Sequence, residues 1–186
     1  TLNHWGMQNV SFSPDSKLVV TSSIYDTAKI WCIENSECIQ TMTHDYIIES
    51  AKFSPDGKYV VTASRDNTSK IWCVETGKCL HTLRHKHDVE SSEFSPDGRY
   101  IVTSSMDNTA KIWSLETGEC LCTLYHDIFV HFAEFSCDCT NIITASGNVV
   151  RKHKLTPLPE ILSRWSEILG PNAELTEEEK EKYFLN

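Results

Sequence analysis

Short runs of apolar and β-branched residues, each closed by a turn, extend along most of the chain. Four of them follow one another between residues 48 and 83, and the turns between them carry proline, glycine, aspartate and asparagine. The runs are Ile48 to Phe53, Tyr59 to Ala63, Ser69 to Val74 and Cys79 to Leu83. Runs of this length and composition predict β-strands, and the short turns predict that successive strands pair antiparallel.

This four-strand unit is an internal repeat. The sequence Phe12-Ser13-Pro14-Asp15 returns after 41 residues, returns again after the same step, and then once more as Phe135-Ser136-Cys137-Asp138. The same step separates tryptophans and cysteines: Trp31, Trp72 and Trp113, and Cys38, Cys79 and Cys120. A unit of four strands at this period is typical of a β-propeller blade. We predict units at about residues 1–40, 41–81, 82–122 and 123–155.

The motifs of these units resemble those of the WD-repeat (WD40) β-propeller family. FSPDG at residues 53–57, TASRDNTSKIW at 62–72 and ETGKCLHTL at 75–83 carry the resemblance, which extends over residues 1–155. The resemblance implies an all-β fold, a propeller arc of four WD-type four-stranded blades of which the first and last are incomplete. Residues 156–186 follow as a short α-helical tail.

The resemblance also implies a hydrogen-bonded tetrad of His, Ser or Thr, Asp and Trp that ties each blade together. The second and third units match it with His44, Thr62, Asp66 and Trp72, and with His85, Thr103, Asp107 and Trp113. We expect no full tetrad in the outer units. In the first, Tyr25 stands in the aspartate column and His4 is one residue out of phase. In the fourth, Asn148 replaces the aspartate, and His153 or Lys154 stands where the tryptophan belongs.

The two ends of the repeat indicate an arc rather than a ring. Thr1 to His4 matches the ends of the predicted outer strands, and no fourth strand follows Leu155. In the WD-repeat family the last blade typically takes its outer strand from the N-terminus, and rings usually hold seven or eight blades. We therefore expect a C-terminal piece of a larger propeller, with the other blades supplied by upstream sequence or a second copy. An open arc with exposed edges is the alternative.

The tail has a helical pattern. Between Pro159 and Leu169 the apolar residues fall on one helical face, and Thr176 to Glu179 forms a capping box. We expect the face around Trp165 to pack on the propeller, and the alternative is a docking helix for another domain. The tail loosely resembles those that follow propellers in bacterial multidomain signalling proteins.

Composition and charge limit the kinds of partner that we expect the chain to bind. The net charge of −9 disfavours nucleic acid, and no apolar stretch approaches the roughly 20 residues needed to span a membrane. Eight cysteines without a recognisable signal peptide favour reduced thiols and a cytoplasmic location. If residues 75–77 form a three-residue turn, Cys73 faces Cys79, and by the same count Cys32 faces Cys38. Such facing pairs lie close to disulfide distance; we expect free thiols, and disulfides are the alternative.

Metal or catalytic chemistry is not expected. His85-Lys86-His87 and Cys120-Leu121-Cys122 lack the paired spacing of a zinc site. The Ser, His and Asp residues occupy repeat columns, so they do not form the single convergent cluster that catalysis needs. We therefore predict no cofactor, no metal site and no enzymatic activity.

Nine variable positions flank the predicted tetrads, in loops at one end of the blades. They lie before the tight turn after the second strand or just before the innermost strand: Ile24, Arg65, Met106, Tyr46, Ile47, His87, Asp88, Ile128 and Phe129. Six of the nine are apolar or aromatic, which suits a surface for a peptide or partner loop. Alternatively, Ile47 and Phe129 pack between neighbouring blades.

The sequence therefore predicts a non-catalytic scaffold that binds segments of other proteins on the top face of the propeller. The alternative is a sensor or regulatory propeller of a larger signalling protein, in which it controls an attached kinase or nucleotide-binding switch.

Overall fold

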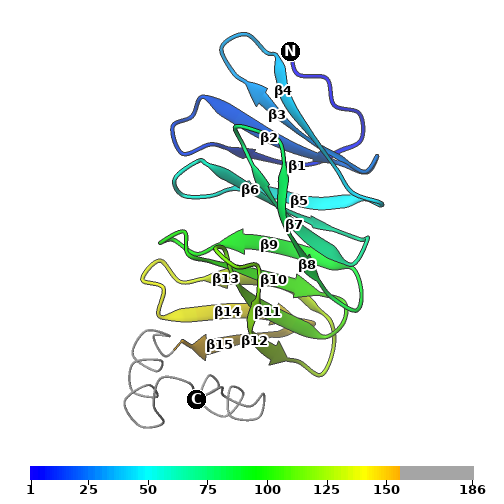
Figure 1. Cartoon of the computed structure of the whole chain (residues 1–186). Coiled ribbons are helices and arrows are strands. Elements are labelled where there is room, and N and C mark those ends of the chain that lie inside the picture. The colour runs from blue at the N-terminus through cyan, green and yellow to red at the C-terminus, as the bar shows by residue number, and fades with distance from the viewer. Residues whose placement is uncertain (156–186) are drawn as a thin grey trace.

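The computed structural model of the chain describes residues 1–155, in which all of the regular structure is β-strand. Figure 1 shows four twisted sheets following one another from the N-terminal blade at the top to the C-terminal blade at the bottom. The all-β architecture and the fourfold repeat are confirmed. The helical tail predicted for residues 156–186, with Trp165, lies outside the described residues.

Each blade is an antiparallel sheet whose strands follow chain order. The first blade comprises β1 (Met7–Phe12), β2 (Leu18–Ser23), β3 (Thr27–Cys32) and β4 (Cys38–Thr43). The second comprises β5 (Ile48–Phe53), β6 (Tyr59–Ser64), β7 (Thr68–Cys73) and β8 (Cys79–Arg84). The third comprises β9 (Val89–Phe94), β10 (Tyr100–Ser105), β11 (Thr109–Ser114) and β12 (Cys120–Tyr125). The fourth comprises β13 (Val130–Phe135), β14 (Asn141–Ser146) and β15 (Val149–Lys154).

The first blade differs from expectation, because its sheet has all four strands. The sequence units were counted from the end of one outer strand to the end of the next. The sheets instead begin at the strands that lie nearest to neighbouring blades, β1, β5, β9 and β13. The fourth blade has three described strands, as predicted, so β15 is an edge strand within residues 1–155.

The repeated Phe-Ser-Pro-Asp motif closes the first hairpin of each blade through side-chain hydrogen bonds. In the second blade the Ser54 hydroxyl donates to the Asp56 carboxylate at 2.7 Å, and the same carboxylate accepts the Lys58 N–H at 3.1 Å. Gly57 completes the turn with a positive φ of 71°, a conformation that glycine adopts at least cost. The degraded fourth copy keeps the serine–aspartate pair, which explains why its hairpin still forms.

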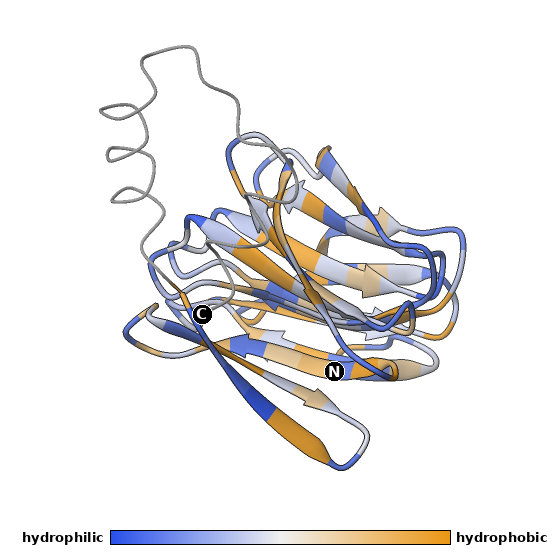
Figure 2. Cartoon of the chain, turned by 90° about the horizontal axis from the view of Figure 1, so that it is seen from below, coloured by the Kyte–Doolittle hydropathy of each residue, from blue (hydrophilic) through white to orange (hydrophobic). Residues whose placement is uncertain are grey.

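Apolar side chains fill the space between successive blades. At the first junction Val20, Ile30 and Met42 of one blade pack with Ile48 and Trp72 of the next, and all five are buried. Equivalent clusters fill the second and third junctions. Figure 2 shows hydrophobic segments running along the stacked strands. Burial of this apolar surface, worth about 25 cal/mol per Å², is what holds the blades together.

The predicted register of the cysteines is wrong. Cys79 pairs with Trp72 rather than with Cys73, because a bulge lies between Ile71 and Trp72. The turn is also longer than assumed, since the Gly77 N–H donates to the Cys73 carbonyl at 2.8 Å. The first blade has the same bulge and pairs Trp31 with Cys38. The thiols of the two expected pairs are free: Cys32, Cys38, Cys73 and Cys79.

Candidate partner-binding face

The tight turn after the second strand of a blade is joined to the loop that leads into its innermost strand. In the second blade the Arg65 N–H donates to the Ile47 carbonyl at 3.0 Å, and in the third the Met106 N–H donates to the Asp88 carbonyl at 2.9 Å. These connections lie at one end of every blade, because successive strands alternate in direction. We call this end the top face.

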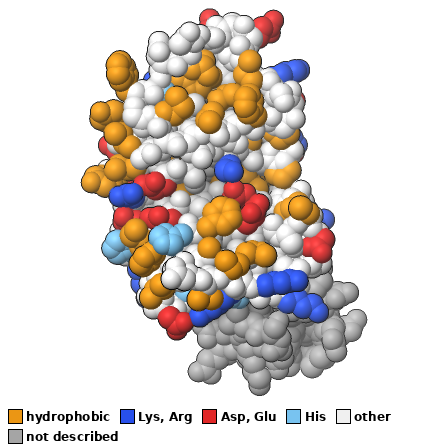
Figure 3. All heavy atoms as spheres, turned by 180° about the vertical axis from the view of Figure 1, so that it is seen from behind, with side chains coloured by type: hydrophobic (Ala, Val, Ile, Leu, Met, Phe, Trp, Pro, Cys, Tyr) orange, Lys and Arg blue, Asp and Glu red, His pale blue; other side chains and the backbone are white. Residues whose placement is uncertain are grey.

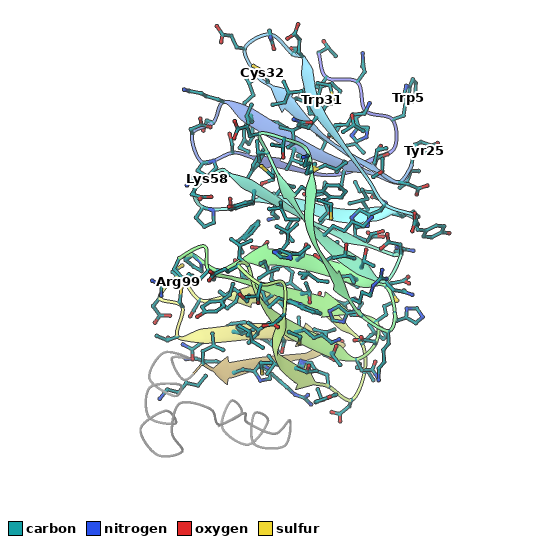
Figure 4. The ribbon with its side chains drawn as sticks, viewed as in Figure 1. Trp5, Tyr25, Trp31, Cys32, Lys58 and Arg99 are labelled. Carbon is teal, nitrogen blue, oxygen red and sulfur yellow. The ribbon has the colours of Figure 1, made fainter. Side chains whose placement is uncertain are left out.

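The nine positions predicted for partner binding all lie in these top-face connections: Ile24, Tyr46, Ile47, Arg65, His87, Asp88, Met106, Ile128 and Phe129. Figure 4 shows Tyr25 beside this end of the first blade, and Lys58 and Arg99 in the turns at the opposite end. The structure therefore brings residues from six separate loops onto one surface.

The tetrad residues form a connected hydrogen-bond chain directly beneath the top face. In the second blade Trp72 Nε1 donates to the Thr62 hydroxyl at 2.9 Å, and Thr62 contacts His44 Nε2 at 2.7 Å. His44 Nδ1 in turn contacts the Asp66 carboxylate at 2.7 Å. The third blade repeats the chain with distances of 2.8, 2.7 and 2.9 Å, in the order Trp113, Thr103, His85 and Asp107.

Asp66 links this buried chain to the top-face loops. Its carboxylate also accepts the backbone N–H of Asp45 at 3.1 Å and that of Thr68 at 2.9 Å. Both contacts fix the backbone on either side of the exposed residues Tyr46 and Arg65. A buried network whose members are all satisfied makes a rigid support for surface side chains.

Burial and hydrogen bonding determine the protonation states of the histidine and the aspartate in the network. Burial alone would raise the pKa of Asp66, but the hydrogen bonds from His44 and Thr68 outweigh it and hold the pKa well below its usual range. Burial lowers the pKa of His44, against the opposing effect of Asp66. The aspartate is therefore ionised and the histidine neutral. Its Nδ1–H donates to Asp66, and its Nε2 accepts the Thr62 hydroxyl proton.

These shifts predict acid sensitivity. The pKa values of both the histidine and the aspartate are lowered in the second and third blades, so the unfolded chain binds more protons than the folded chain as the pH falls. The stabilisation is complete above about pH 6.5, the ordinary histidine value, and is lost progressively below it. We expect melting temperatures to fall between about pH 7 and pH 5, by about 2–4 °C for each kcal/mol lost.

Thermal unfolding followed by circular dichroism at a series of pH values measures this slope. A double variant, His44→Asn with His85→Asn, should be less stable at neutral pH but should show a shallower slope. A melting temperature that stays constant or rises on acidification contradicts the proposed protonation states.

The outer blades build different networks from their altered residues. In the first, His4 Nδ1 contacts Thr21 at 2.7 Å and its Nε2 contacts Thr27 at 3.0 Å, while Trp31 Nε1 donates to Thr21 at 2.9 Å. A threonine thus takes the contact that the aspartate makes elsewhere. Tyr25, in the aspartate column, is released to the surface, where it is 64% exposed.

In the fourth blade, a second histidine takes the tryptophan position. His126 and His153 stack with ring centroids 5.5 Å apart, and Nε2 of each contacts the Thr144 hydroxyl, at 2.9 and 3.0 Å. Arg151 pairs with Asp127 at 2.7 Å beside them. As expected, neither outer blade has the full tetrad among its described residues.

Several of the predicted residues expose apolar surface. Tyr46 is 54% exposed, Ile128 45%, Ile24 38% and Phe129 37%, although all are large hydrophobic side chains. Phe129 and His131 also form a T-shaped ring contact with their centroids 4.6 Å apart. The remaining predicted residues are exposed or half-buried: Ile47, Arg65, His87, Asp88 and Met106.

Sequence reasoning missed two groups of top-face residues. Trp5 is 83% exposed, and its carbonyl accepts the Ser23 hydroxyl in the first blade at 2.6 Å. Glu49, Glu90 and His131 occupy one repeat column at the start of the innermost strands. The variability of this column, which holds Gln8 in the first blade, was the signal that could have identified it.

Charged groups from three blades interact in the middle of the top face. Arg65 forms an ion pair with Glu49, and its pKa is raised by the hydrogen bond and charge of Glu49 and further by Glu90 and Asp88 of the next blade. Burial raises the pKa of Glu90, Glu49 adds to the effect, and Arg65 and His131 oppose it. These groups are therefore close enough to influence one another across two junctions.

The family model for the WD domain, G-beta repeat, matches residues 2–32, 36–73 and 77–114, which is more than half of the chain. The chain belongs to the WD40 repeat family. WD40 repeats generally mediate protein–protein interactions, and WD40 propellers are typically non-catalytic. The comparison with curated proteins found no match.

Within residues 1–155, no group of three or more His, Cys, Asp or Glu side chains is arranged to hold a metal ion. The same part of the WD40 chain has no helix with the length and apolar character of a membrane span.

Proposed function

We propose that this WD40 chain is a non-catalytic interaction scaffold that binds segments of partner proteins on its top face. The observation that carries the proposal is the set of exposed apolar and aromatic side chains held above a buried hydrogen-bond network. Exposed apolar residues gathered on one surface are typical of protein interaction sites, and aromatic side chains are enriched there. The regulatory alternative uses the same surface, and it differs in requiring an attached effector domain.

A groove at the opposite end of the molecule is the competing location. It lies between the second and third blades, has a volume of about 570 Å³, and is lined by residues that include Tyr59, Leu80, Arg99, Tyr100 and Leu115. It contains fewer exposed apolar side chains than the top face, with Leu80 at 45% exposure. The two locations are separable by mutation.

The double variant Tyr46→Ser with Ile128→Ser tests the top face. Peptides selected from a random displayed library against the immobilised chain should bind this variant about tenfold more weakly, because two apolar contacts are removed. The melting temperature should change little, since both side chains are already largely exposed. Isothermal titration calorimetry measures the affinity.

The matched control is Ile39→Ser with Leu80→Ser. These residues have similar exposure, 43% and 45%, but lie on the outer strands β4 and β8. Peptides that bind the control variant normally place the site on the top face. Peptides that lose affinity only for the control variant would place it at the groove and refute the proposal.

A further inference from the structure

The top face has three regions in order along the arc. Exposed aromatic side chains lie at the first blade and its junction with the second, where Trp5, Tyr25 and Tyr46 are 83%, 64% and 54% exposed. Their loops are connected, because the His44 N–H donates to the Asp26 carbonyl at 3.0 Å. At the other end, Ile128 and Phe129 form a second apolar region on the fourth blade.

A charged region separates these two apolar regions. It consists of Glu49 and Arg65 on the second blade, Asp88 and Glu90 on the third and His131 on the fourth. Along the left edge of Figure 3, hydrophobic side chains toward the first blade give way to a band of basic, acidic and histidine side chains. From the first blade to the fourth, the top face is therefore apolar, then charged, then apolar again.

The charged region has an excess of carboxylates. Arg65 is the ion-pair partner of Glu49, so its single positive charge offsets the charges of Asp88 and Glu90 only in part. Asp88 contacts His87 Nδ1 at 3.2 Å, which is an ion pair only when the histidine is protonated. Lys86, in the same loop, is exposed, and its backbone N–H rather than its side chain binds Asp107.

Glu90 is the least satisfied member of this group. Its Oε1 atom is buried and has no hydrogen-bond partner within residues 1–155. Burial, and after it the nearby charge of Glu49, raises the pKa of Glu90, and the opposing charges of Arg65 and His131 do not cancel this effect. A buried carboxylate oxygen without a donor is costly, and a ligand that supplies the donor removes this cost.

We propose that the partner segment carries a lysine or arginine that reaches Glu90, with apolar residues on both sides of it. This inference rests on the proposed function and names the chemistry of its ligand. The cationic head balances the charges of Asp88 and Glu90, and it supplies the missing hydrogen bond when the half-buried Glu90 side chain turns toward it. The apolar neighbours of the cation contact the aromatic side chains of the first junction on one side and Ile128 and Phe129 on the other.

The same charges exclude other ligands. An acidic segment is repelled by Asp88 and Glu90, and a purely apolar segment leaves the Glu90 oxygen buried without a donor. The aliphatic stem of a lysine or arginine also packs well against an aromatic ring such as Tyr46. Selectivity for a cation between apolar residues therefore follows from the order of the three regions.

The test is selection from a random peptide library displayed on phage, with the full chain as target. We expect the peptides that depend on Tyr46 and Ile128 to be enriched in lysine or arginine between apolar residues. Their affinity should fall about tenfold for Glu90→Gln and should also fall as salt is raised. Glu34→Gln, in the exposed β3–β4 turn at the opposite end, is the matched control and should bind normally.

Replacing the central lysine or arginine of a selected peptide with glutamate tests the same contact without altering the protein, so it remains informative if Glu90→Gln does not fold. Loss of binding is expected. Top-face peptides that show no cationic preference, or that bind Glu90→Gln and the glutamate peptide normally, overturn this inference and leave the proposed function standing. A library that yields no peptide dependent on Tyr46 and Ile128 overturns both.

Discussion

Replacing Asp66 with alanine is expected to lower the free energy of unfolding by about 1–3 kcal/mol, the cost of leaving buried partners unsatisfied. The carboxylate accepts hydrogen bonds from His44, from Thr68 and from the backbone N–H of Asp45. Alanine leaves the buried Nδ1–H of His44 without its strongest acceptor. Urea unfolding followed by tryptophan fluorescence measures the change.

Asp45→Ala is the matched control for Asp66→Ala. Asp45 is the same residue type in an adjacent loop, but its side chain is exposed, so its loss should cost no more than about 0.5 kcal/mol. In a double-mutant cycle, His44→Ala and Asp66→Ala should be strongly non-additive, because each removes the same contact. Equal effects of Asp45→Ala and Asp66→Ala would show that the network contributes nothing beyond an exposed aspartate.

The chain of 186 residues is expected to self-associate in solution through its first blade. Met7, Val10 and Phe12 are 49%, 55% and 63% exposed. The residues in the same repeat columns of the later blades are covered by the preceding blade, and Ile48 and Ala51 are fully buried. An uncovered apolar sheet face gains about 25 cal/mol for each Å² that association buries.

Light scattering over a range of concentrations measures this association. The double variant Val10→Ser with Phe12→Ser should shift the molecule strongly toward the monomer, with little loss of folded stability because both side chains are exposed. Ile39→Ser with Leu80→Ser removes similar apolar surface from the outer strands and should leave association unchanged. A wild-type chain that is monomeric at every concentration would show that the face of the first blade is not a contact surface. Association that persists in the Val10 and Phe12 variant would place the contact elsewhere, with the edge strand β15 as the first candidate.

Local sequence was sufficient for the strands and their repeat. The Phe-Ser-Pro-Asp turn is closed by residues within five positions of one another, such as Ser54, Asp56 and Tyr59, so its motif predicts its structure directly. The tetrad columns were also visible, because the second and third blades repeat them at a fixed step. Contacts of this kind depend on spacing along the chain, and spacing is what a sequence contains.

The register of the outer strands could not be predicted in the same way. A single bulge between Ile71 and Trp72 shifts the register so that Cys79 does not pair with Cys73. The residues of the turn did not indicate this bulge. In the first blade, Thr27 contacts His4, although the tetrad of the family assigns no role to the residue at this position of the repeat. Both outcomes depend on how the backbone packs after the strands have formed.

The sequence by itself determined the blade, its four-strand unit, the positions of its tetrads and the loops that form the top face. Only the tertiary structure decided which side chains from different blades meet there. Arg65, Glu90 and His131 lie on three different blades, and they interact because successive blades pack against one another. Local patterns specify each blade independently, whereas the charge and apolar surface of the top face arise from packing between blades.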